Sequence, residues 1–125
     1  MQEAVRIITA GGRDFGDYRL LADTLDSLLT ELETDDITIV SGGCRGADTL
    51  GERYASEHGI PIKVFPADWK TWGRAAGPIR NRQMAEFASA GHGILIAFWD
   101  GKSRGTASMI RLAGQYGLDT LVTKY

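Results

Sequence analysis

Short apolar runs alternate with longer amphipathic stretches along the whole chain. Within residues 17–33, leucines recur at helical spacing and predict a helix with one apolar face; they are Leu21, Leu25, Leu28, Leu29 and Leu32. The run at residues 93–98 is apolar throughout, as expected of a strand buried on both faces of a sheet. The same reasoning predicts strands over residues 4–9, 37–40, 62–65 and 93–98, a short last strand at Leu121 and Val122, and helices over residues 17–33, 46–58, 78–90 and 105–116.

Strands that alternate with helices indicate parallel strands joined by right-handed crossovers. The predicted fold class is α/β: a three-layer, Rossmann-like, doubly wound sheet, mainly parallel, with about five strands and helices on both faces. No domain boundary, internal repeat or low-complexity segment is visible, so residues 1–125 are predicted to form a single domain. In such sheets ligands bind beyond the carboxyl ends of the strands. The residues that directly follow each strand are therefore the candidates for function.

Glycine-rich segments follow the first two strands. Gly11 and Gly12, with Arg13 next to them, fit either a plain turn or a backbone that comes close to a phosphate. After the second strand, backbone amides and a helix start would suit an anion; this loop contains Ser41, Gly42, Gly43, Cys44, Arg45, Gly46, Ala47 and Asp48. Its Asp48 fits either a first-turn acid or a partner for a ligand hydroxyl, and its Cys44 is predicted to pack rather than react.

The segment after the third strand carries two tryptophans, Trp69 and Trp72. They could stack on a base or anchor a long loop on the core. The helix that follows begins near Pro78, which places Arg80 and Asn81 in its first turn. Because Arg80 and Arg82 lie two apart, they cannot share one helical face, and Arg80 is predicted to face the ligand.

A further glycine-bearing loop leads from the fourth strand into the last helix. Gly105 and Thr106 could offer an amide and a hydroxyl to a phosphate at the helix start, and Ser103 or Thr106 could cap that helix. Lys102 and Arg104 add positive charge there. Asp100 could bind a hydroxyl or act as a base.

Composition restricts the class of protein. The chain has 125 residues, 43% of them hydrophobic and 24% charged, and no apolar run approaches the ~20 residues that cross a bilayer. No signal peptide is visible, and the single cysteine cannot form an internal disulfide. A cytoplasmic location without membrane contact is expected, and no metal site is predicted.

The net charge of −2 argues against nucleic acid as a partner, because such binding is driven by a basic surface. The charges are unevenly placed, however. Eight acids lie between Asp14 and Asp36 with only Arg19 to offset them. Most later cations lie in loops or at helix starts, which favours phosphate capture over ordinary surface charge.

Four motifs occur in order between about residues 7 and 112: Gly-Gly-Arg-Asp-Phe, Ser-Gly-Gly-Cys-Arg-Gly-Ala-Asp, Pro-Ala-Asp-Trp followed by Ala-Gly-Pro-Ile-Arg-Asn-Arg, and Phe-Trp-Asp-Gly-Lys-Ser-Arg-Gly-Thr. Together they resemble the YspA/YpsA-related branch of the SLOG superfamily, which includes DprA and the Lonely Guy enzymes. The resemblance implies a Rossmann-like fold and a nucleotide-derived ligand such as AMP, ADP-ribose or an NAD-like molecule. The phosphate-binding positions it implies are Gly11, Gly12, Arg13, Ser41, Gly42, Gly43, Gly46, Gly105 and Thr106, with Arg80 and Asn81 facing the ligand.

One departure from the Lonely Guy pattern concerns catalysis. Those enzymes remove ribose 5-phosphate with a Pro-Gly-Gly-x-Gly-Thr-x-x-Glu motif, and Met109 stands at the glutamate position here. A thioether cannot transfer a proton, so this activity is not implied, and Asp100 or Glu86 would have to act instead. The catalytic residues are left unassigned.

The sequence therefore predicts a domain that binds or senses a phosphate-bearing nucleotide or nucleotide derivative. A hydrolase that cleaves an N-glycosidic or phosphoester bond is the alternative, and a DNA-processing or protein-interaction module is the third interpretation. Relatives with this fold are often dimeric, so a homodimer is kept open.

Overall fold

The structure is a computed structural model that describes residues 3–125. Five parallel strands form one sheet in the order β3-β2-β1-β4-β5. The strands are β1 (Val5–Gly11), β2 (Ile37–Ser41), β3 (Ile62–Val64), β4 (His92–Trp99) and β5 (Asp119–Lys124). The predicted fold class is therefore confirmed.

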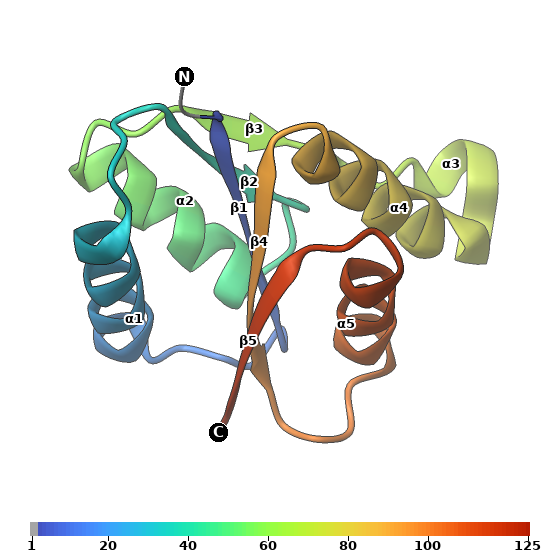
Figure 1. Ribbon diagram of the computed structural model, residues 1–125. Helices are drawn as coiled ribbons and strands as arrows, with labels where there is room; N and C mark the ends of the chain where they lie inside the picture. The colour runs from blue at the N-terminus through green and yellow to red at the C-terminus, as the bar shows by residue number, and fades with distance from the viewer. Residues whose placement is uncertain (1–2) are drawn as a thin grey trace.

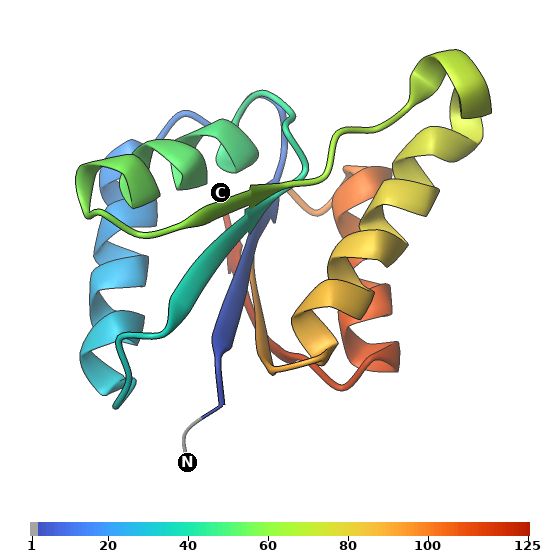
Figure 2. The ribbon, with the colours of Figure 1, turned by 90° about the horizontal axis from the view of Figure 1, so that it is seen from above.

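Helices cover both faces of the sheet (Figure 1). They are α1 (Tyr18–Glu31), α2 (Ala47–Glu57), α3 (Trp69–Trp72), α4 (Ala76–Ser89) and α5 (Arg104–Gln115), with a 3-10 turn η1 (Gly73–Ala75) between α3 and α4. Helices α1 and α2 lie on one face, and α4 and α5 lie on the other (Figures 1 and 2). Short α3 stands outside both layers, beyond the beginning of α4 (Figure 2).

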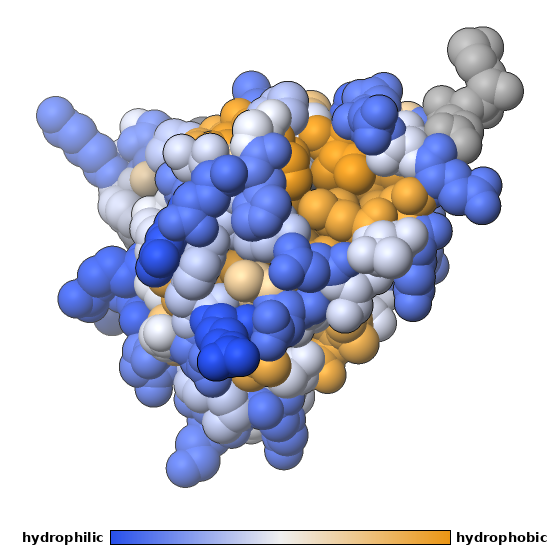
Figure 3. Space-filling model, turned by 90° about the vertical axis from the view of Figure 1, so that its left-hand side faces the viewer, coloured by the Kyte–Doolittle hydropathy of each residue, from blue (hydrophilic) through white to orange (hydrophobic). Residues whose placement is uncertain are grey.

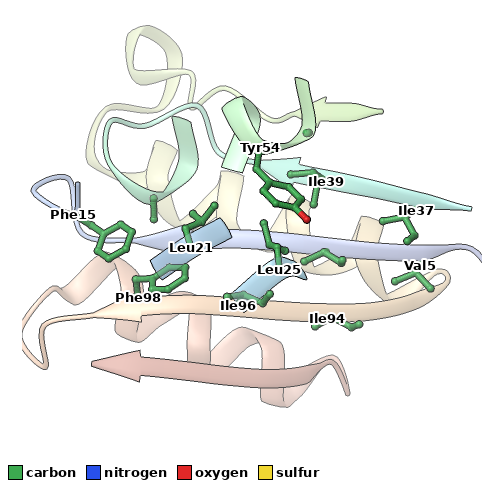
Figure 4. Packing of buried hydrophobic residues seen from close by; sticks show 13 residues of the cluster. Val5, Phe15, Leu21, Leu25, Ile37, Ile39, Tyr54, Ile94, Ile96 and Phe98 are labelled. Atoms are coloured by element: carbon green, nitrogen blue, oxygen red, sulfur yellow. The ribbon is translucent and has the colours of Figure 1, made fainter. Parts of the chain in front are cut away.

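Two buried clusters hold the layers together, one on each face of the sheet. In the cluster under α1 and α2, Leu21 and Tyr54 reach down from the helices toward Ile39 and Phe98 on the strands (Figure 4). The rings of Phe15 and Phe98 stack with centroids 4.5 Å apart. This contact fixes the loop after β1 against β4, which is where the cavity described below begins.

The outward sides of α1 and α2 are polar, as the leucine pattern of α1 requires. Figure 3 shows this face covered mainly by hydrophilic side chains, with an apolar area in its upper right part. Most of the eight acids between Asp14 and Asp36 lie on α1 or on the segment that links it to β2. The acidic part of the chain therefore belongs to the layer opposite α4 and α5.

Candidate functional site

A cavity of about 680 Å³ opens at the carboxyl ends of β1 and β4. At this point of the strand order, successive helices leave toward opposite faces of the sheet, which is where ligands bind in open α/β folds. The wall comes from the loop after β1, the first halves of α4 and α5, and two residues that follow β2. The lining residues are Ala10, Gly11, Gly12, Arg13, Asp14, Cys44, Asp48, Trp69, Gly77, Pro78, Arg80, Asn81, Met84, Asp100, Ser103, Arg104, Gly105, Thr106, Ser108 and Met109.

Arg80 is the most deeply buried cation of this wall, with 9% of its surface exposed. Its Nε donates to Asn81 Oδ1 at 2.9 Å, and its Nη1 donates to the Gly42 carbonyl at 2.7 Å and lies 3.4 Å from Cys44 Sγ. Among residues 3–125, its Nη2 has no hydrogen-bond acceptor and no carboxylate lies within 4.0 Å. Arg82 is exposed to solvent, so Arg80 faces the cavity as the helical spacing predicted.

Three amides of the loop after β2 donate to the protein's own side chains. The amides of Gly42 and Cys44 donate to Asp48 Oδ2 at 3.0 and 3.4 Å, and the Gly43 amide donates to Ser41 Oγ at 3.0 Å. These three amides are therefore not available to a phosphate in this structure, and phosphate binding by the rest of the loop stays a prediction. Ser41, Gly42 and Gly43 do not line the cavity.

Gly46 is needed for packing rather than for a ligand. Its φ is +86°, and a Cβ at this position would lie 2.1 Å from the Gly12 carbonyl oxygen. Only glycine allows the loop after β2 to approach the loop after β1 this closely. Gly46 also lies outside the cavity wall.

Asp48 is a buried carboxylate, with 5% of its surface exposed. Burial raises its pKa to about 6, although nearby Arg80 and the amides of Cys44 and Gly42 act in the opposite direction. A Cβ on Gly42 would lie 2.7 Å from both Arg80 Nη1 and Asp48 Oδ2. Gly42 therefore separates the two charged groups, and its backbone connects them by hydrogen bonds.

The first turn of α5 forms the opposite wall. Ser103 caps the helix, and its hydroxyl oxygen accepts a hydrogen bond from the Thr106 amide at 3.4 Å. The amides of Arg104 and Gly105 lie in the first turn, where backbone N–H groups have no partner within the helix. Asn81 Nδ2 donates to the Gly105 carbonyl at 3.3 Å, which ties α4 to α5. Since Asn81 also holds Arg80 Nε, it positions the guanidinium beside this helix start.

Asp100 shapes the loop that leads into α5. Its Oδ1 accepts from the amides of Lys102 and Ser103, each at 2.8 Å. These hydrogen bonds, that of Ser103 first, lower the pKa of Asp100 and keep it ionised. The same hydrogen bonds hold the carboxylate in one position at the entrance to α5.

Gly11, Gly12 and Arg13 lie on the cavity wall, where the sequence predicted them. A Cβ at Gly11 would lie 2.4 Å from the Phe98 carbonyl oxygen, so this glycine also permits close packing of β1 and β4. Arg13 is exposed and makes no ion pair within residues 3–125. It is therefore free to approach a ligand at the mouth of the cavity.

Two other candidates lie away from the cavity. Glu86 is exposed near the end of α4, where it accepts from the Tyr116 hydroxyl at 3.1 Å. Trp72 is 55% exposed and does not line the cavity, whereas Trp69 does. Glu86 is therefore not placed to act on a molecule in the cavity.

Several lining residues had not been proposed as site residues; they are Ala10, Asp14, Cys44, Gly77, Pro78, Met84, Ser108 and Met109. Helical spacing could have found two of them. Met84 follows Arg80 by four residues, and Ser108 follows Gly105 by three, so each shares a face with a residue already assigned. Met109, the thioether at the Lonely Guy glutamate position, is buried in the same wall.

Comparison with known proteins places this fold in a family. The model of the YspA, cpYpsA-related SLOG family matches residues 5–72. The chain belongs to this SLOG family. The chain is similar in sequence to the Gene 61 protein of Mycobacterium phage D29, with 31% identity over 123 residues. The match covers 93% of this chain and 94% of the relative.

Two solved structures of DNA processing protein A (DprA) share the fold of this SLOG chain. The Streptococcus pneumoniae protein matches 94% of this chain with a TM-score of 0.71 and 17% sequence identity. The Helicobacter pylori protein matches 96% of this chain with a TM-score of 0.66 and 20% sequence identity. The SLOG chain spans 50% and 65% of the length of those two chains. At these identities the likeness establishes the fold.

The H. pylori structure describes a mode of single-stranded DNA binding by DprA. The prediction that argued against nucleic acid as a partner of this SLOG chain is therefore wrong, because a protein of the same fold binds it. That prediction rested on net charge, which does not describe this edge: most of the acids between Asp14 and Asp36 lie on and beside α1, whereas the cavity wall holds Arg13, Arg80 and Arg104 together with Asp14, Asp48 and Asp100. Within residues 3–125, no helix is long and apolar enough to span a bilayer.

Proposed function

We propose that this SLOG chain binds a phosphate-bearing nucleotide or nucleotide derivative in the cavity between α4, α5 and the loop after β1. The observation that carries the proposal is the buried Arg80 guanidinium. It lines the cavity with one nitrogen unpartnered and without an ion-pair partner among residues 3–125. The nearest anion, Asp48, lies just outside ion-pair distance behind the Gly42 backbone, so a bound phosphate could approach the guanidinium more closely than the protein's own carboxylate does.

The start of α5 supports an anion at the same place. The amides of Arg104 and Gly105 and the positive end of the helix favour a phosphate there. A Cβ built on Gly105 meets no atom within 4 Å, so space is open directly beside these amides. Arg13 and Arg104 add positive charge at the mouth of the cavity.

The remaining wall suits the base of a nucleotide. Ala10, Met84 and Met109 supply apolar surface, and Trp69 offers an aromatic ring. Pockets for small ligands commonly combine such walls with a few converging polar groups in about 300–1,000 Å³. The cavity of about 680 Å³ lies within that range.

The test compares Arg80→Ala with Arg82→Ala, a matched control two residues further along α4. AMP, ADP-ribose and NAD are titrated into each protein by calorimetry, with adenosine as the ligand that lacks phosphate. We expect Arg80→Ala to weaken the bound nucleotide about tenfold to a hundredfold, because a charge-assisted hydrogen bond and a close counter-charge are lost. Unchanged affinity in Arg80→Ala, or adenosine binding as tightly as AMP, would contradict the proposal.

Binding of single-stranded nucleic acid at the same edge is a second candidate function. The DprA neighbours favour it, and so do the exposed cations Arg13, Lys102 and Arg104 around the cavity. An affinity for single-stranded DNA that falls steeply with salt would support this function. Affinity for mononucleotides alone would favour the first.

A further inference from the structure

Helix α3 presents two large aromatic side chains to solvent. Trp69 is 50% exposed and Trp72 is 55% exposed, on a helix of four residues. This helix stands outside the two helical layers and packs on η1 and the beginning of α4 (Figure 2). Tryptophan is highly buried on average, so two exposed rings on one protruding segment indicate a binding surface.

The two rings differ in their relation to the cavity. Trp69 lines it, and its ring lies against Gly77, where an added Cβ would be 3.4 Å from Trp69 Cη2. Trp72 lies three residues further on, which makes it a neighbour of Trp69 on the helix surface. Trp72 is therefore the second ring within the same short helix that a ligand extending outward past Trp69 would have available.

The charge around α3 is positive. Residues 59–85 contain five cations and a single acid: Lys63, Lys70, Arg74, Arg80 and Arg82 against Asp68. The Asp68 carboxylate caps α3 by accepting from the Thr71 amide at 3.1 Å. Lys70 and Arg74 are exposed, and within residues 3–125 neither forms an ion pair.

Aromatic rings with cations beside them are the features that bind unpaired nucleotides, because rings stack on bases while cations attract the phosphates. An acidic peptide would use the cations but would leave two adjacent rings without matching partners. We propose that the site takes a ligand with two bases joined through phosphate, the first base against Trp69 and the second against Trp72. This inference rests on the proposed nucleotide site, since Trp69 belongs to both.

The test uses three ligands: AMP, the 5′-phosphorylated dinucleotide pApA, and the same dinucleotide with an abasic second position. Each is titrated into the unmodified chain, Trp72→Ala and Trp72→Phe, with Leu121→Ala on β5 as a control for loss of an exposed apolar side chain. We expect pApA to bind about tenfold tighter than AMP, from stacking of the second base. This gain should be absent with the abasic ligand and in Trp72→Ala, and largely kept in Trp72→Phe and Leu121→Ala.

AMP itself should bind equally well to Trp72→Ala and to the unmodified chain. Equal affinity for pApA and AMP, or a pApA advantage that survives in Trp72→Ala, would overturn the two-base inference while leaving the cavity proposal intact. Failure of the cavity proposal has a different signature, namely AMP affinity that does not depend on Arg80. Absence of binding by all three ligands would overturn both.

Discussion

Single residues decide how much of the cavity rim remains for a ligand. Asp48 occupies the amides of Gly42 and Cys44, whereas Arg80 keeps one guanidinium nitrogen without a protein partner. The two side chains are separated by the backbone of Gly42 and make no ion pair within 4.0 Å. The cavity wall therefore contains a buried anion as well as a cation that keeps one nitrogen without a protein partner.

Asp48 should make folding stability depend on pH. Its folded pKa of about 6 lies above the ordinary value of 3.8, so the folded state takes up a proton more readily than the unfolded chain. The contribution of Asp48 to stability is then full below about pH 4 and is lost as pH rises through 6, by up to about 3 kcal/mol. Asp48→Asn keeps an acceptor oxygen but removes this dependence.

Urea denaturation at pH 5, 6, 7 and 8 measures the effect. The free energy of unfolding of the unmodified chain, relative to that of Asp48→Asn, should fall between pH 5 and 7 and then stay level to pH 8, where Asp48 is ionised in both the folded and the unfolded state. Asp23→Asn, an exposed change on α1, serves as the control and should follow the unmodified chain. A constant difference between the unmodified chain and Asp48→Asn at every pH would show that Asp48 titrates normally.

Among the elements, α5 contributes its first turn to the cavity. Gly105 lies in that turn and Gly114 near the other end, and a Cβ on either meets no atom within 4 Å. Gly105 lines the cavity and Gly114 does not, but both positions have space for an added methyl group. This pair separates the effect of filling the cavity from the effect of a glycine replacement in the helix.

Gly105→Ala should weaken nucleotide binding about tenfold or more, because its methyl group enters the space beside the amides of Arg104 and Gly105. Gly114→Ala should leave the affinity unchanged and raise stability by up to about 1 kcal/mol through helix propensity. Calorimetric titration and thermal unfolding measure the two quantities. Equal affinity of both variants for the nucleotide would place the phosphate elsewhere.

The elements also show how far the sequence could lead. Apolar periodicity located α1, α2, α5 and the central strands to within a few residues, because tertiary burial requires that periodicity. It gave no signal for α3, whose four residues are too few to show a period, and α4 begins at Ala76, two residues before Pro78. Strand β5 extends over six mostly exposed residues, so it lacks the apolar run that marks a buried strand.

The same limit applies to the site. Residues that follow strands and helix starts, such as Arg80 and Gly105, could be predicted because the fold brings them to one edge. The internal hydrogen bonds from Gly42 and Cys44 to Asp48 could not, since they depend on the path of the loop after β2. A glycine-rich sequence is equally compatible with amides that face a ligand and with amides that face the protein.

At the scale of the whole molecule, the fold places many acidic and basic residues in different layers, which the order of residues in the sequence does not show. Acids gather on and beside α1, on one face of the sheet, while α4 and α5 on the other face carry Arg80 and Arg104 to the cavity. Surface charges more than about 10 Å apart are largely screened at physiological salt. The local charges of the cavity wall, three arginines and three aspartates, therefore matter more at the carboxyl edge than the net charge of −2.

The central claim is that a nucleotide phosphate lies between Arg80 and the first turn of α5. Its most direct test is an NMR titration of ¹⁵N-labelled protein with AMP and, separately, with adenosine. We predict that AMP shifts the signals of the Arg104 and Gly105 amides and of Arg80 Nε more than those of α1 and α2, and that adenosine leaves these three signals nearly unmoved. Saturable AMP binding that leaves them in place would contradict the account.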